Sequence, residues 1–170
     1  MDPAIIEVVL RWLHFLSGIV WIGHNYAGVI LVPRFVPYSP AQDTGESLTS
    51  SYMGRVSREH AMFRYSSLVA LGTGVLMLFN QDRLWSAVTL SGFDAPIGLA
   101  IWIGTFMALN LWLVMWPHQK KVLGFVPAPL EERVRCSRIT FLSARTNTML
   151  SLPLLFFMEA GVHAPFLFSG

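Results

Sequence analysis

The chain of 170 residues contains one cysteine and few charged side chains. Cys136 alone excludes an intrachain disulfide, a CxxCH haem-attachment motif and an iron–sulfur or zinc site built from several thiolates. Charged residues make up 13% of the sequence, whereas soluble domains carry roughly 25%. The net charge of +2 comes from arginines and lysines that flank apolar runs, and it does not indicate nucleic-acid binding.

Long apolar runs dominate the rest of the sequence, which is 54% hydrophobic. A helix that crosses a bilayer needs about 20 apolar residues, and four windows meet this length: residues 4–32, 61–79, 95–116 and 141–163. The predicted fold class is therefore all-α, an integral membrane four-helix bundle that forms one domain over residues 1–170. The first run is too long, and its leader too poor in basic residues, for a cleaved signal peptide.

Basic residues are concentrated in two of the three predicted connections between these helices. The first connection carries Arg34, Arg55 and Arg58, and the third carries Lys120, Lys121, Arg133, Arg135 and Arg138. By the positive-inside rule these connections face the cytoplasm, so both termini are predicted on the periplasmic side of a bacterial inner membrane. The run from Trp116 to Lys121 is typical of an aromatic anchor followed by lysines among lipid headgroups. The alternative is an electrostatic clamp for an anionic partner or lipid.

Polar residues follow one face of the first and of the last predicted helix. Ionisable groups in a spanning helix are costly and usually face the bundle interior. In the first helix the spacing alternates between four and three residues, through Glu7, Arg11, His14, Gly18, Trp21, Asn25 and Gly28. In the last helix the same spacing connects Arg145, Met149, Leu152, Phe156, Glu159 and His163.

Two imidazoles on separate helices at similar depth predict a bis-histidine site for haem b. His14 and His163 are the expected iron ligands, with Arg11 beside the propionates and Glu159 orienting His163. Gly18 and Gly28 are expected to let a neighbouring backbone or a flat ligand approach the first helix.

Trp21 completes the predicted cofactor-binding set, and the other histidines are weaker candidates. An inner-leaflet site formed by His24 and His60 is sterically conceivable, although an interfacial anchor is the more common role for His60. His118 is expected in a solvated loop after Trp116 and Pro117. A hydrogen-bonded structural role remains the alternative for His14.

Four segments of the chain resemble the urate oxidase N-terminal membrane domain family, which includes bacterial membrane-bound urate hydroxylases. They read RWLHFLSGIVWIG from Arg11, FR from Phe63, NLWLVMWPHQKK from Asn110 and ARTNTMLSLPLLFFM from Ala144. The resemblance covers nearly the whole chain, in order. In fuller members a larger membrane domain precedes a C-terminal cytochrome c domain, which implies electron transfer to periplasmic c-type haem.

The chain departs from this family pattern at several points. It has no CxxCH motif and resembles a short form without the cytochrome c domain, so another polypeptide would accept the electrons. The arrangement from Glu159 to His163 shifts the histidine of the family motif, and His24 replaces an apolar or hydroxyl residue. Urate chemistry is not implied, because no residue set identifies a purine pocket.

The predicted function is a small inner-membrane redox subunit that binds haem b. It would relay electrons between the quinone pool, or a membrane partner, and a periplasmic cytochrome c. The alternative is a cofactor-free accessory subunit packed against a larger membrane complex, in which the polar faces form interhelical hydrogen bonds. A third hypothesis is a self-contained oxidoreductase that acts on a heterocyclic substrate.

Overall fold

The computed structural model describes residues 2–40 and 50–164, and every regular element in these ranges is helical. This confirms the all-α class. The elements are α1 (Pro3–Leu31), α2 (Ser50–Asn80), α3 (Leu84–Val88), the 3-10 helix η3 (Gly92–Asp94), α4 (Ala95–Leu109), the π-helix η4 (Asn110–Met115), α5 (Trp116–Val122) and α6 (Leu130–His163).

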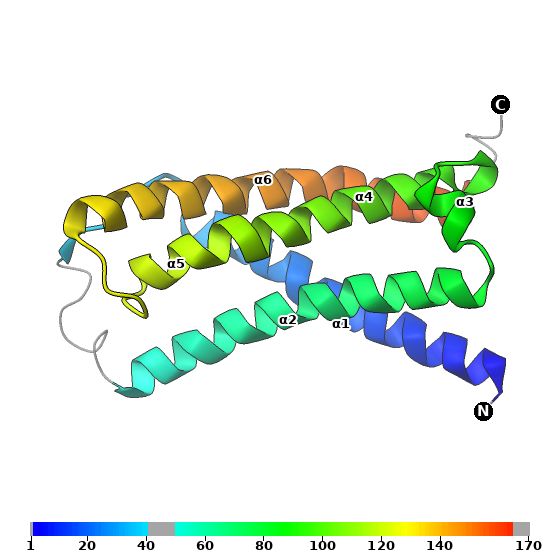
Figure 1. Cartoon of the computed structure of the whole chain (residues 1–170), viewed down its shortest axis with the longest axis horizontal. Helices are drawn as coiled ribbons and strands as arrows, with labels where there is room; N and C mark the ends of the chain where they lie inside the picture. Colours follow the sequence, from blue (N-terminus) through cyan, green and yellow to red (C-terminus); the bar gives the residue numbers. More distant parts are fainter. Residues whose placement is uncertain (1, 41–49, 165–170) are drawn as a thin grey trace.

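Four long rods, namely α1, α2, the continuous α4–η4–α5 segment and α6, alternate in direction along the molecule (Figure 1). The start of α1, the end of α6 and α3 lie at one end, which we name the α3 end. The end of α1 and the starts of α2 and α6 lie with α5 at the other, which we name the α5 end. α1 packs on α2 and on α6, and α6 also packs on α4 and α5.

Three of the rods are long and apolar enough to cross a membrane: Ala4–Leu31, Met53–Asn80 and Gly92–Val122. α6 is longer, with 34 residues, but does not belong to this set because polar side chains such as Asn147 and Ser151 interrupt its apolar sequence. Large apolar side chains, among them Trp12 and Phe156, are more than half exposed. Contact with a lipid bilayer accounts for this exposure.

Prolines and caps explain where the rods begin and end. The side chain of Asp2 accepts a hydrogen bond from the backbone N–H of Ala4 at 2.9 Å, and Pro3 occupies the first turn of α1. Pro33 disfavours helical backbone at Val32, where α1 ends. The third rod instead continues through Pro117 to Val122, directly after the π-helical segment. The expectation that His118 lies in a loop is therefore wrong.

Helices approach each other closely at two glycines beside the core. A Cβ atom added to Gly98 would lie 1.9 Å from the carbonyl oxygen of Ala87, and one added to Gly161 would lie 2.4 Å from Cγ1 of Ile97. Small residues of this kind let helices approach each other closely. The main apolar cluster comprises Trp21, Phe63, Ala70, Ala100, Met107, Ala108, Leu111, Met115 and Leu154.

Candidate functional site

A cavity of about 320 Å³ lies between α1, α2, α5 and α6 toward the α5 end. This volume falls at the lower end of the range for small-molecule pockets, roughly 300–1,000 Å³. Most of its lining is apolar, as in other ligand sites, with a few polar side chains among it. These include His24 and Asn25 from α1, His60 from α2, Gln119 from α5 and Arg145 from α6.

Two imidazoles line this cavity side by side. The ring centroids of His24 and His60 are 6.1 Å apart, and their planes are inclined by 71°. The other neighbour of His24 is Phe63, whose ring is stacked on it at 4.2 Å. Because His60 and Phe63 are three residues apart on α2, they share one helix face, and His24 packs against that face. The carboxylate of Glu59 lies 3.8 Å from Nδ1 of His24.

The tautomer of His60 follows from its hydrogen bond. Its Nδ1 is 2.9 Å from the carbonyl oxygen of Val56. A carbonyl oxygen only accepts, so Nδ1 carries a proton, and in the neutral ring Nε2 is the nitrogen with the lone pair. The lone pair faces the side-chain amide of Gln119, at 3.5 Å between the nitrogens. Imidazoles that bind metals through Nε2 are commonly oriented by such a bond from Nδ1.

Asn25 supplies the second chemical feature of the cavity. The residue is 4% exposed, and its Nδ2 has no hydrogen-bond partner among the described residues. A buried donor without an acceptor costs free energy, so this amide favours an occupant that offers an acceptor. Three residues further along α1, a Cβ added to Gly28 would meet nothing within 4 Å. The backbone of α1 is therefore open to a flat ligand beside Asn25.

Arg145 brings a positive charge to the cavity wall. Its Nη2 donates to the carbonyl oxygen of Val32 at 2.6 Å, and its guanidinium lies 4.7 Å from the centre of the Phe141 ring. Within the described ranges, no carboxylate forms an ion pair with Arg145. The guanidinium is thus available to an anionic group of an occupant.

These side chains fit a haem group in their donor chemistry. Two imidazoles that share one metal ion have ring centroids roughly 6 Å apart, because each metal–nitrogen bond is about 2 Å. The rings of His24 and His60 meet this separation. The amide of Asn25 and the guanidinium of Arg145 could hold carboxylate groups of the porphyrin, and Gly28 leaves space for its plane.

The predicted ligand pair has different surroundings. Nδ1 of His14 is 2.8 Å from the carbonyl oxygen of Ala70 and 3.3 Å from Oγ1 of Thr73, both on α2. His163 has a 69% exposed side chain, and its Nε2 lies 3.9 Å from the carboxylate of Glu159, one turn earlier on α6. The structure thus does not bring His14 and His163 together. Within the described residues, His14 bridges α1 and α2.

The other predicted cofactor residues are also dispersed. Arg11 is exposed and pairs with Glu7 at 2.8 Å. Trp21 is 3% exposed in the main apolar cluster, and its Nε1 has no hydrogen-bond partner in the described part of the chain. A Cβ added to Gly18 would meet nothing within 4 Å. None of these three residues lines the cavity.

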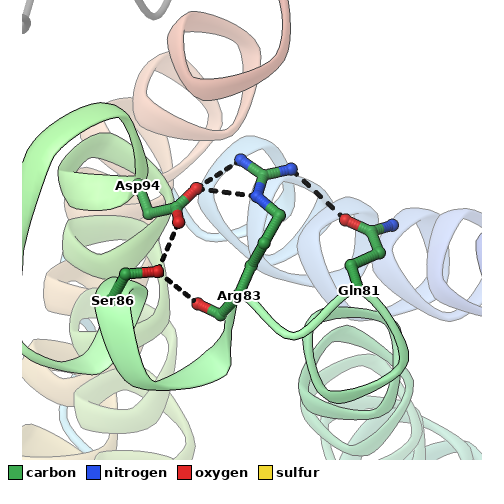
Figure 2. Close-up of polar contacts among 4 residues, drawn as sticks. All are labelled: Gln81, Arg83, Ser86 and Asp94. Carbon is green, nitrogen blue, oxygen red and sulfur yellow. Dashed lines mark hydrogen bonds and ion pairs between the residues drawn. The ribbon is translucent and has the colours of Figure 1, made fainter.

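The sequence prediction missed a polar network at the α3 end, which Figure 2 shows. Nε of Arg83 donates to the carboxylate of Asp94 at 2.7 Å, and Nη1 donates to the side-chain oxygen of Gln81 at 3.2 Å. The hydroxyl of Ser86 donates to Asp94 and to the backbone carbonyl of Arg83. Gln81 in turn donates to Glu7 on α1 at 2.6 Å. The network joins α1, the end of α2 and the start of α4.

The cavity residues that the prediction missed gave partial signals. Asn25 lies on the polar face of the first helix and Arg145 begins that of the last, whereas the sequence places the run with Gln119 at the membrane surface. Comparisons with protein-family models, curated proteins and solved structures find no match to this chain. The resemblance to the urate oxidase N-terminal membrane domain family therefore stays a prediction from the residues quoted above.

Proposed function

We propose that this chain is a small membrane redox subunit that binds haem b, and that His24 and His60 would hold its iron. The observation that carries the proposal is the 6.1 Å separation of these two imidazole rings at a cavity wall. Haem bound there would supply one-electron transfer. Asn25 and Arg145 would hold its propionates. The carbonyl of Val56 would hold Nδ1 of His60, and the iron would take the place of Gln119 at Nε2.

The proposal includes α6 as a fourth membrane span and both termini on the periplasmic side. The distribution of arginines and lysines between the two ends supports this topology. Arg11 and Arg83 at the α3 end each pair with a carboxylate. The α5 end carries an excess of arginines and lysines, which favours the cytoplasmic side.

A site near the cytoplasmic leaflet narrows the choice of electron partners. The quinone pool or an adjacent membrane subunit would exchange electrons directly with haem at His24 and His60. The cavity lies away from the α3 end, which is the proposed periplasmic end. Electron delivery to a periplasmic cytochrome c would therefore need a further electron carrier in an adjacent membrane subunit.

A visible spectrum of the purified protein after dithionite reduction tests the proposal. We expect a sharp α-band, and its loss in both His24→Ala and His60→Ala. The matched control is His118→Ala, because His118 also bonds to a carbonyl of its own rod, that of Val114 at 2.6 Å, but does not line the cavity. A featureless spectrum of protein produced with ample haem would contradict the proposal. Loss of the band in His14→Ala but not in His24→Ala would contradict the ligand assignment.

The second candidate function is a cofactor-free accessory subunit of a larger membrane complex. The observation in its favour is α1, of whose apolar window only 11% is buried inside the molecule, compared with 33% for the other two candidate spans. A partner subunit could cover this surface, and His14 would then serve only the contact between α1 and α2. Co-purification of fixed larger subunits without haem would favour this function.

A further inference from the structure

Arg64 on α2 lies against three aromatic rings outside the cavity lining. Its Cζ is 3.6 Å from the ring centre of Trp116, 5.3 Å from that of Trp112 and 5.7 Å from that of Tyr65. Cation–π attraction holds the guanidinium at these rings. Its Nε donates to the carbonyl oxygen of His60 at 3.2 Å. Within the described residues, the two terminal nitrogens of the guanidinium have no acceptor.

A second cation shares the same indole ring. Nζ of Lys120 on α5 is 5.9 Å from the ring centre of Trp116. Within the described ranges, Lys120 makes no ion pair, whereas its neighbour Lys121 is bonded to Glu132. Two positive charges from different rods therefore converge on one tryptophan.

No carboxylate of the described residues neutralises this pair. The carboxylate of Glu59, on the same helix as Arg64, lies beside the His24 ring, and that of Glu132 pairs with Lys121. Arg64 lies within the apolar helix Met53–Asn80, where an unpaired cation is costly. The free energy of this arrangement falls if an anion from outside the chain joins it.

We propose that Arg64, Lys120 and Trp116 form a binding site for the phosphate group of an anionic phospholipid. A guanidinium matches two phosphate oxygens at once, and an ammonium adds a point charge. The lipid is favoured over free phosphate because Tyr65 and Leu113, on the same two rods, are 56% and 67% exposed and provide an apolar surface for acyl chains. Basic pockets between membrane helices on the cytoplasmic side recognise lipid headgroups in this way.

Native mass spectrometry of the full chain in mild detergent tests this site. The protein is mixed with equimolar phosphatidylglycerol and phosphatidylcholine, and the two lipid adducts are counted. We expect the unchanged protein to prefer phosphatidylglycerol. This preference should fall about fivefold in Arg64→Gln, and by about the same factor in the separate variant Lys120→Gln. Arg64→Lys should retain part of it, because the charge remains but the planar fork is lost.

The matched control is Arg138→Gln, because Arg138 is an exposed arginine of α6 with no aromatic contact in the described structure. This variant should keep the full preference. Equal adducts of both lipids in the unchanged protein, or equal losses in Arg64→Gln and Arg138→Gln, would overturn the proposal. If excess inorganic phosphate displaces phosphatidylglycerol, the site binds free phosphate, and the proposal of a lipid ligand is overturned. If Arg64→Gln does not fold, Lys120→Gln at the half-buried α5 position decides the outcome.

Discussion

Asn110 donates its side-chain amide to Oδ1 of Asn147 at 2.8 Å and so joins the third rod to α6. The same amide donates to the carbonyl oxygen of Ser143, and Nδ2 of Asn147 donates to that of Met107 at 3.1 Å. Asn147 is fully buried. The π-helical segment begins at Asn110, where this contact is made. The side-chain oxygen of Asn147 thus accepts from Asn110, while the amide of Asn147 donates to a backbone carbonyl of the third rod.

Replacement of Asn147 by leucine should destabilise the protein. The change leaves the amide of half-buried Asn110 without its side-chain acceptor, at a cost of about 1–3 kcal/mol. Thermal unfolding in detergent measures this loss. Thr146→Ala, at the adjacent exposed position, is the control and should unfold like the unchanged protein. Equal stability of the two variants would show that the amide pair contributes nothing.

Gly98→Ala should lower stability, because the new Cβ would overlap the backbone carbonyl of Ala87 and one of the two helices would have to move. Overpacking of this kind costs about 1–3 kcal/mol. Gly72→Ala is the matched control, because nothing lies within 4 Å of its added Cβ. Alanine favours helix over glycine, so this control should be unchanged or more stable by up to about 1 kcal/mol. A scan of melting temperature compares the two, and an unchanged Gly98→Ala would contradict the close contact.

Gly28→Phe should abolish haem binding without unfolding the protein. The added ring would enter the open space beside Asn25 in the cavity, where the porphyrin is proposed to lie. Gly23→Phe adds the same ring to an open position of α1 that does not line the cavity, so it should retain the α-band. The reduced spectrum and circular dichroism together distinguish lost haem from lost fold. Equal α-bands in both variants would exclude the cavity as the haem site.

Cys136 should resist alkylation in the folded protein. It is 3% exposed, and burial raises the pKa of its thiol, so the reactive thiolate forms only at higher pH than in a free cysteine. Maleimide at neutral pH should therefore label the protein only after denaturation. A cysteine introduced at exposed Arg138 should react at once and serves as the control. Rapid labelling of native Cys136 would show that this part of α6 opens readily.

Local sequence information was sufficient for the helical class and for several boundaries. Apolar runs of bilayer length predicted the rods, and Pro3 and Pro33 lie at the two ends of α1. Pro117 was misleading as a stop signal. Pro117 lies in the first turn of α5, where its missing backbone N–H removes no hydrogen bond within α5. The π-helical turn before it lets the rod continue to Val122.

The sequence by itself determined which residues share a helix face, because helical periodicity is a local property. Only the tertiary structure decided which neighbour each face meets. α1 crosses the bundle, so its half near His14 packs on α2, while Asn25 and Tyr26 reach Thr148 and Ser151 of α6. That crossing depends on close contacts between distant segments, such as the one between the His14 ring and Gly74. No spacing within one helix encodes this crossing. Because of the crossing, His24 lies beside His60, whereas His14 packs on α2 and not against His163.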